Sequence, residues 1–307
     1  MGIRRRDILA GIGALVSAPS LQYVRAAVPP FRRKLGAIEI IVISDGVLNV
    51  PLSFAIPDAP KDELTALLAA NNLPAGGMPS PTNVTLIRAG DDVVLLDAGS
   101  GSNFQDTAGK LAENMEAVGI DPASVTKVVF THGHADHLWG AIDDFDDSER
   151  FPKASYVVSA SEWDFWTNTS TPDSVPDWLK GMARGSGRIL KRLESKIERR
   201  GAGDSLGAGL SYIATPGHTP GHMSVMVESG PERLIVGGDV LSHPAVSFAQ
   251  PGWRMGSDFD SDLAVATRKR MLDRLASDRV PFIGFHLPFP GHGIVEKRGS
   301  AYRFQPV

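Results

Sequence analysis

Four side chains that can bind metal ions lie close together in the chain, at His132, His134, Asp136 and His137. The apolar run 125–130 comes directly before them and is predicted to be a short buried strand. Imidazole and carboxylate ligands suit zinc or a similar divalent metal. So dense a group of ionisable residues is unusual in a packed core. We therefore predict a metal site at the turn that follows this strand.

Three further candidate ligands, His218, Asp239 and His286, each follow a run that is predicted to be a strand. In α/β architectures, binding sites form just beyond the carboxyl ends of strands. All eight histidines of the chain fall between His132 and His292. The sequence therefore predicts one site to which both halves of the chain contribute.

Composition excludes several other kinds of chemistry. The chain contains no cysteine, which rules out disulfides, thiolate metal sites, iron–sulfur clusters and cysteine nucleophiles. There are 31 lysines and arginines against 35 acidic residues, and this slight acidity argues against nucleic acid as a partner. The content of 42% hydrophobic and 21% charged residues is typical of a globular protein.

The expected elements alternate between strands and helices. Residues 84–96 are predicted to form a hairpin, and residues 38–48 a strand broken by a turn at Asp45-Gly46. Helices are expected at 103–118, 161–166, 175–200 with an interruption at Gly185 and Gly187, and 260–277. Because strands occur in both halves and helices close each half, we expect an α/β fold of two sheets packed face to face, with helices outside.

One segment, 51–82, contains six prolines and few strand signals. We expect an ordered loop there with a short helix at 62–70, and long loops of this kind are usually functional.

The N-terminus has the features of an export signal. Three arginines, at positions 4–6, precede a modestly apolar stretch, and small residues around Ala26 suit a signal peptidase. Arg5-Arg6 resembles the twin-arginine motif. The alternatives are a general secretory signal or an amphipathic helix. We expect a signal peptide at 1–26, a single domain at 27–307 without a membrane span, and a periplasmic or secreted location.

The ordered set His132-x-His134-x-Asp136-His137, then His218, Asp239 and His286, resembles the metallo-β-lactamase superfamily. Shorter segments resemble the methyl parathion hydrolase family and its relatives, which include organophosphate hydrolases, lactonases and aryl esterases. These segments are Ser44-Asp45-Gly46, Asp164-Phe165-Trp166, 286–291 and 302–307. The superfamily resemblance implies an αββα sandwich with two mixed sheets, and it suggests a homodimer.

The resemblance also implies a role for each ligand. His132, His134 and His218 would hold one metal, and Asp136, His137 and His286 a second. Asp239 and a hydroxide would bridge two divalent ions, with zinc expected first and manganese, cobalt or iron as alternatives. Two features depart from the family pattern: Trp139 replaces the usual glycine, and Ser242 stands where many acylhomoserine lactonases have tyrosine.

Two cations a few ångströms apart make hydroxide available near neutral pH, so no side-chain nucleophile is needed. We expect Asp136 and Asp239 to take part in catalysis, with Asp136 orienting the attacking hydroxide or moving a proton. Asp45 and Asp97 are candidates to hydrogen-bond the ligating imidazoles, with an ordinary turn as the alternative for Asp97. His222 is expected to form hydrogen bonds and not to bind metal.

Apolar residues near the ligands predict the substrate class. Trp139, Phe165, Trp166 and Leu287 are the expected pocket residues, and no cluster of arginine or lysine accompanies them. Packing in the core is the alternative for Trp139, Phe165 and Trp166. Such a pocket favours a neutral ester, which could be a lactone, an aryl ester or a phosphotriester, and we expect a lactone or carboxylic ester to be preferred. The alternatives are a thioester hydrolase of the glyoxalase II type, a sulfatase, a β-lactamase, an iron-dependent persulfide dioxygenase or an inactive metal-binding member.

Overall fold

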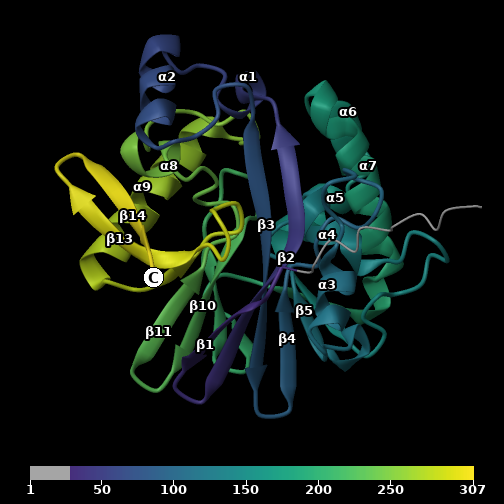
Figure 1. The fold of residues 1–307 in the computed structure, drawn as a ribbon. Coiled ribbons are helices and arrows are strands. Elements are labelled where there is room, and N and C mark those ends of the chain that lie inside the picture. Colours follow the sequence, from purple (N-terminus) through teal and green to yellow (C-terminus); the bar gives the residue numbers. More distant parts are fainter. Residues whose placement is uncertain (1–27) are drawn as a thin grey trace, which may run out of the picture.

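The structure is a computed structural model that describes residues 28–307. The export signal expected at 1–26 lies outside these residues. Two sheets of seven strands each form the centre of the described part. Figure 1 shows these sheets between helices on either side. The first sheet has the strand order β1 (Phe31–Leu35), β2 (Ile38–Val50), β3 (Met78–Ala89), β4 (Asp92–Leu96), β5 (Lys127–Val129), β6 (Ser155–Ser159) and β7 (Ile197–Arg200).

The second sheet has the order β14 (Ala301–Pro306), β13 (His292–Arg298), β12 (Phe282–Ile283), β11 (Glu232–Val236), β10 (Met223–Ser229), β9 (Leu210–Ala214) and β8 (Ser205–Gly207). Each sheet is mixed. Strands β4 to β7 run parallel, as do β11 and β12, and the other pairs are antiparallel. The predicted sandwich of two mixed sheets is therefore confirmed.

Alternation along the strands separates the layers. In β2, Ile40 and Val42 point into the core between the sheets, whereas Ile41 and Ile43 point into the core under the helices. Side chains alternate between the faces of a strand, so a strand buried on both faces must be apolar throughout. Burying each such side chain contributes about 1.5–3 kcal/mol to folding.

Helices cover the outer face of each sheet (Figure 1). Those that pack on the first sheet are α3 (Leu111–Ala117), α5 (Ala160–Thr167) and α7 (Asp177–Arg192). The second sheet is covered by α9 (Ser261–Asp278) through Met271, Leu272 and Leu275. Five shorter or more peripheral helices complete the set: α1 (Leu52–Ala55), α2 (Lys61–Ala70), α4 (Ala135–Leu138), α6 (Thr171–Ser174) and α8 (Val246–Ala249). None of the helices in residues 28–307 combines the length and apolar character needed to cross a bilayer.

The structure corrects several predicted boundaries. The helix expected from residue 103 begins only at Leu111, because the buried carboxylate of Asp45 accepts the backbone N–H groups of Gly109 and Leu111 and draws the preceding loop around itself. Asp45 itself lies at a register shift inside a continuous strand and does not end that strand. Helix α5 is capped by Ser159, two residues before the expected start at Ser161.

Helix α7 runs through Gly185 and Gly187 without interruption, contrary to expectation. These glycines allow close packing. A Cβ atom at Gly185 would lie 2.3 Å from the Trp139 ring, and one at Gly187 would lie 2.6 Å from the carbonyl oxygen of Trp166. The segment 51–82 contains the expected helix, α2, but it also contains α1 and the start of β3. The helix expected at 175–200 ends at Arg192, and the last residues of that range form β7. The sequence reasoning also missed β1, β8, β13 and β14.

Candidate metal centre

The predicted ligands meet at one edge of the sandwich. The loops that carry them follow β5, β9, β11 and β12 directly, and β4 ends just before Asp97. Strands β4 and β5 are parallel neighbours, as are β11 and β12, so their carboxyl ends face the same way. This arrangement produces two sets of candidate metal-ligand atoms. Within each set, all atoms lie within 4.8 Å of one another. The two sets are metal group 1 (His132, His134, His218 and Asp239) and metal group 2 (Asp136, His137 and His286).

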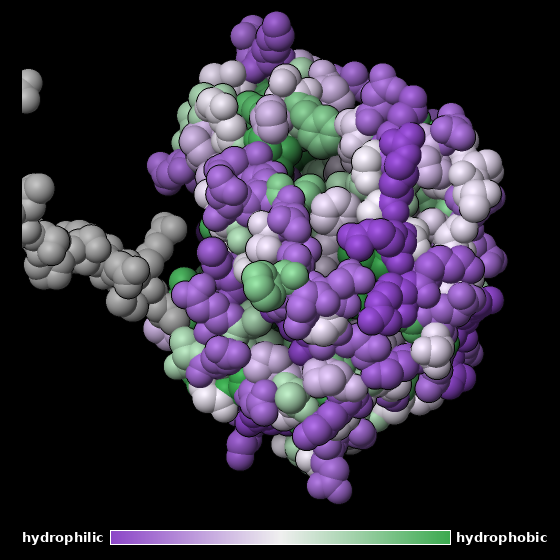
Figure 2. All heavy atoms as spheres, turned by 90° about the vertical axis from the view of Figure 1, so that its right-hand side faces the viewer, coloured by the Kyte–Doolittle hydropathy of each residue, from purple (hydrophilic) through white to green (hydrophobic). Residues whose placement is uncertain are grey.

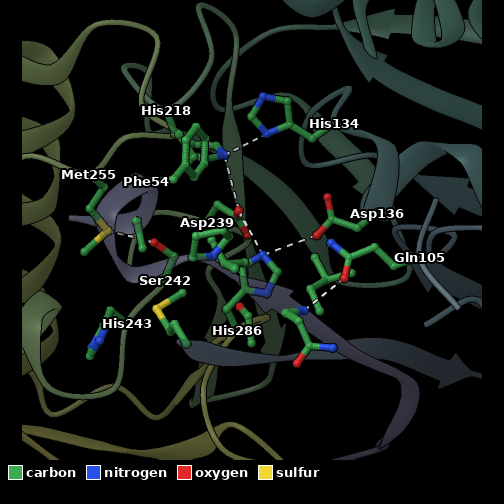
Figure 3. Close-up of a pocket in the computed structure, with 18 of the residues that line it drawn as sticks. Phe54, Gln105, His134, Asp136, His218, Asp239, Ser242, His243, Met255 and His286 are labelled. Atoms are coloured by element: carbon green, nitrogen blue, oxygen red, sulfur yellow. Dashed lines mark hydrogen bonds and ion pairs between the residues drawn. The ribbon is translucent and has the colours of Figure 1, made fainter. Parts of the chain in front are cut away.

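Metal group 1 consists of buried imidazoles that converge on one point. Nδ1 of His134 lies 3.0 Å from Nε2 of His132 and 3.0 Å from Nε2 of His218. All three side chains are at most 5% exposed. In Figure 3, His134 and His218 point toward each other and toward the carboxylate of Asp239. This arrangement offers three ring nitrogens and one carboxylate oxygen to a single cation.

Asp239 lies between the two metal groups. Its Oδ2 is 3.2 Å from Nε2 of His218 in metal group 1, and 3.2 Å from Nε2 of His286 in metal group 2. Its Oδ1 is 3.2 Å from Nε2 of His137. Asp136 completes metal group 2, with Oδ2 3.3 Å from Nε2 of His286. This placement agrees with the bridging position expected for Asp239.

Several buried polar atoms at this point have no hydrogen-bond partner within the described part of the chain: Oδ2 of Asp136, Nε2 of His137 and Oδ1 of Asp239. A buried polar atom left unpaired costs free energy, so such atoms normally have a partner. All three belong to the predicted ligands and are of the N and O types that zinc and similar divalent ions bind. The donor set therefore fits two divalent metal ions.

The electrostatics of the cluster attract positive charge. Burial would raise the pKa of Asp239, but the surrounding histidines, His286 first, hold that pKa well below its usual value. Burial favours neutral His286, but Asp239 overrides this and raises the pKa of His286 to about 10. Burial lowers the pKa of His132 and His134 well below the usual value. Metal ions would supply the positive charge in place of protons.

Asp97 supports both metal groups. Its Oδ2 accepts a hydrogen bond from Nδ1 of His137 at 2.8 Å and another from the hydroxyl of Thr131 at 2.9 Å. That hydroxyl in turn lies 3.0 Å from Nδ1 of His132. Asp97 adopts a left-handed backbone conformation with φ of 66°, which is rare outside glycine and recurs at functional sites. The geometry thus gives Asp97 the partner role predicted for it.

Asp45 does not have the same role. Its carboxylate accepts hydrogen bonds from Ser100, Gly109 and Leu111, and it contacts no ligating imidazole. Burial raises the pKa of Asp45 to about 6. The prediction that it orients a ligand is wrong, since the loop 100–111 takes all of its hydrogen-bonding capacity.

Two partners of the ligands were missed by sequence reasoning. Asp258, just before α9, lies 3.0 Å from Nδ1 of His218, and its other oxygen pairs with Arg268 at 2.9 Å. The carbonyl oxygen of Pro81 accepts a hydrogen bond from Nδ1 of His286 at 2.9 Å. No local motif marks either contact, because both join segments far apart in the chain.

His222 forms hydrogen bonds and is absent from both metal groups, as predicted. Its Nε2 accepts the backbone N–H of Asp239 at 2.9 Å, and its Nδ1 lies 2.8 Å from the hydroxyl of Thr215. Burial lowers the pKa of His222 to about 3. The neutral ring therefore holds the backbone of Asp239 in place.

A cavity of about 410 Å³ opens onto both metal groups. Its walls are mainly apolar, and Figure 2 shows a hollow beside hydrophobic residues near the top of the molecule. Apolar side chains on the walls include Leu48, Val50, Phe54, Ile56, Met78, Phe104, Trp178, Met182 and Met255. Polar ones include Asn49, Ser80, Gln105, Ser242, His243 and Ser257, and residues 28–307 contribute no lysine or arginine to the lining.

The four residues predicted to form the pocket do not line this cavity. Trp139 packs on α7 and donates its indole N–H to Ser186, while Leu287 is fully buried. Trp166 is 2% exposed and packs edge to face against His134, with ring centroids 5.7 Å apart. Phe165 packs on Phe259. These residues were predicted from their closeness in sequence to the ligands, whereas the walls come from the end of β2, from α1, β3 and α7, and from loops around residues 104 and 242–257.

Comparisons with known proteins agree with this geometry. The profile of the metallo-beta-lactamase superfamily matches residues 77–286. The N-acyl homoserine lactonase AttM of Agrobacterium fabrum is 36% identical over 124 residues, which cover 38% of this chain and 40% of that protein. AttM of Azorhizobium caulinodans is 30% identical over 178 residues, covering 54% and 60%. The chain thus spans about half the length of these curated relatives.

Two solved structures are similar over nearly their whole length. AidC, described as a dizinc quorum-quenching lactonase in complex with a product, superimposes with a TM-score of 0.86 and 27% identity, covering 91% of this chain and 97% of that chain. The hydrolase AbOPH, described as a member of the beta lactamase superfamily, gives a TM-score of 0.85 and 26% identity with the same coverage.

Proposed function

This chain belongs to the metallo-β-lactamase superfamily, and we propose that it is a binuclear metal-dependent hydrolase of neutral esters, with lactones that carry an apolar chain as the preferred substrates. The observation that carries the proposal is the composition of the cavity. Apolar walls without lysine or arginine open directly onto both metal groups. An anionic substrate, such as a sulfate ester or a glutathione thioester, would find no cationic side chain in this lining to pair with.

The chain's own residues divide the work between holding metal and holding substrate. When bound, two divalent ions would supply a hydroxide at neutral pH and polarise the ester carbonyl. Asp136 belongs to metal group 2 and also lines the cavity, so its carboxylate can hold a proton next to the reacting ester. Met78, Met255 and Trp178 exclude water and would bind an apolar chain.

The similar proteins support a lactone over the other neutral esters. The AttM proteins are named as N-acyl homoserine lactonases, and AidC is described as a lactonase. Ser242, which replaces the tyrosine of many acylhomoserine lactonases, lines the cavity and donates its hydroxyl to Sδ of Met255 at 3.1 Å. A phosphotriester or an aryl ester would react at the same residues. On the basis of the similar proteins, we expect both to react more slowly than a lactone.

A kinetic panel tests the proposal. The purified protein, loaded in turn with zinc, manganese and cobalt, would be given lactones of increasing acyl length, an aryl acetate, a phosphotriester, a glutathione thioester and a β-lactam. We expect the highest kcat/KM for a lactone with an apolar chain. A thioester or β-lactam that exceeds every lactone by about tenfold, or about 1.4 kcal/mol, would overturn the substrate class.

We further propose that the protein is exported by the twin-arginine route as a folded, metal-loaded chain. The basis is the sequence alone, Arg5-Arg6 ahead of an apolar stretch. Replacing both arginines by lysine should trap the precursor in the cytoplasm, whereas export that continues would point to the general secretory route. The homodimer suggested by the family resemblance stays a prediction, and sedimentation of the purified protein would test it.

A further inference from the structure

The carboxylate of Glu162, in the first turn of α5, accepts four hydrogen bonds beside metal group 1. Oε2 accepts the backbone N–H of Gly133 at 2.8 Å and the indole N–H of Trp166. Oε1 accepts the backbone N–H of Gly221 at 2.8 Å and the hydroxyl of Thr219. The side chain is fully buried, and it forms no ion pair with a lysine or arginine in residues 28–307.

Three of these donors come from the two loops that carry the histidines of metal group 1, and the fourth is the indole of Trp166 in α5 itself. Gly133 lies between His132 and His134, and Thr219 directly follows His218. The indole of Trp166 is in turn packed edge to face against His134. A single carboxylate therefore joins two loops that are more than eighty residues apart in sequence, and it does not line the cavity.

The N-terminus of α5 and two nearby glycines allow Glu162 to reach these loops. Glu162 stands three residues after Ser159, a spacing at which glutamate usually bonds back to the N-terminus of its own helix. Here Ser159 caps the helix and donates its hydroxyl to the carbonyl of Gly221, while the glutamate turns toward the loops. A Cβ atom at Gly133 would lie 2.3 Å from Nε1 of Trp166, and one at Gly221 would lie 2.4 Å from the backbone nitrogen of Glu162.

We propose that Glu162 is a positioning residue, which sets the distance between the two loops so that the three imidazoles of metal group 1 are arranged for a cation before it binds. The inference rests on the metal-binding part of the proposed function. It goes further by assigning the affinity of metal group 1 to a residue that contacts neither metal nor substrate. Groups that hydrogen-bond a ligating imidazole directly change metal affinity by about 10–100-fold, and we expect a change within this range for Glu162, which acts on the same imidazoles through their loops.

The variant Glu162→Gln tests the proposal with little change in volume. Its amide oxygen can accept hydrogen bonds from one loop, but its NH2 group then faces N–H donors of the other loop. Titration of the chelator-stripped protein with zinc, against a competing chromogenic chelator, should show one site weakened by about 10–100-fold. The second site should change much less. In the cobalt-substituted protein, the absorption bands of the weakened site should shift.

A readout that needs no metal separates this inference from the proposed function. In chelator-stripped Glu162→Gln, the amide protons of Gly133 and Gly221 should exchange with solvent faster than in the unaltered protein. If the unaltered chain binds no metal but these amides lose protection in the variant, the proposed function fails and the positioning role stands. If the amides exchange at unchanged rates and both metals bind as tightly as before, Glu162 only fills the core and the inference is wrong.

Two controls guard against a general loss of stability. Leu275→Ala should destabilise the core under α9 by about 2–5 kcal/mol without changing either metal affinity. If Glu162→Gln does not fold, the pair Thr219→Val and Thr219→Ser replaces it. The valine removes one hydrogen-bond donor to Glu162 and should lower the metal affinity of metal group 1. The serine keeps the hydroxyl, so its metal affinity should equal that of the unaltered protein. Equal affinities in these two variants would also overturn the inference.

Discussion

Oδ1 of Asp258 lies 3.0 Å from Nδ1 of His218, and this contact fixes which ring nitrogen is free for a metal. With Nδ1–H donated to the carboxylate, the lone pair of Nε2 points at metal group 1. The other carboxylate oxygen pairs with the buried Arg268, whose charge keeps Asp258 from being an isolated buried anion. Asp258 thus links the metal affinity of His218 to the packing of α9, which carries Arg268.

We predict that Asp258→Asn weakens metal binding and stability together. The amide cannot accept hydrogen bonds from His218 and Arg268 at once, so one donor is left unpaired. We expect metal affinity to fall by about 10–100-fold and unfolding free energy to fall by roughly 3–5 kcal/mol. Metal titration and thermal unfolding measure the two effects.

The neighbouring residue Asp260 provides the matched control. It caps α9 through the N–H of Leu263 and contacts no ligand. Asp260→Ala should cost about 1 kcal/mol of stability and leave the metal content unchanged. An equal loss of metal in both variants would contradict the role of Asp258.

The convergence of the candidate ligands could be predicted from the sequence because each belongs to a short segment that can be recognised by itself. A strand, a turn and a histidine or aspartate recur at His218, Asp239 and His286, and parallel strands bring such turns to one edge. The sandwich followed from the same alternation of strands and helices. A local sequence pattern predicts the position of a side chain when that position depends only on the strand and turn that carry it.

The cavity and the partners of the ligands could not be predicted in this way. Asp258 and Glu162 reach their partners only after α9 and α5 have packed, and neither residue stands in a metal-binding motif. Trp166 was assigned to the pocket from its neighbours in sequence, but its indole N–H is held by Glu162 on the buried side of His134. The free energy of packing, which depends on the whole fold, decides such positions.

Asp239→Asn should remove most of the activity and weaken one metal. A neutral amide balances less charge between two cations, and it leaves His137 and His286 with one carboxylate, that of Asp136, in place of two. Elemental analysis should show close to two metals per chain in the unaltered protein and fewer in the variant. Unchanged metal content and a rate near normal in Asp239→Asn would contradict the bridging position.

His243 should make stability depend on pH. Burial lowers its pKa to about 4, and its Nδ1 accepts the N–H groups of Ala245 and Val246, so the folded chain holds the ring neutral. Because the unfolded chain binds this proton at its ordinary pKa near 6.5, stability is lost as pH falls from about 6.5 toward 4.

The variant His243→Asn keeps an acceptor for these N–H groups but does not titrate. Urea unfolding of the chelator-stripped proteins should give a smaller loss of stability between about pH 6.5 and 4 for the variant, since one proton is removed from the difference between the two states. Parallel pH curves for both proteins would show that His243 does not titrate in this range.

Trp178 should set the preference for apolar chains. Its ring lies at the cavity wall, packed edge to face on Phe54 at 5.2 Å, and it remains 38% exposed. Trp178→Ala would remove apolar surface from the wall, and we expect KM for a lactone with a long acyl chain to rise by about 5–30-fold, or roughly 1–2 kcal/mol. A lactone without a side chain should be affected less, because it has less apolar surface to place against this ring.

Two further variants test whether the effect of Trp178→Ala is specific to the cavity wall. Phe145→Ala removes an aromatic ring that is 97% exposed and does not line the cavity, so it should change neither substrate. Trp166→Phe removes a hydrogen bond to Glu162, so it should lower turnover of short and long lactones alike. If Trp166→Phe discriminates by chain length and Trp178→Ala does not, the substrate chain lies along α5, and the cavity described here is not its binding site.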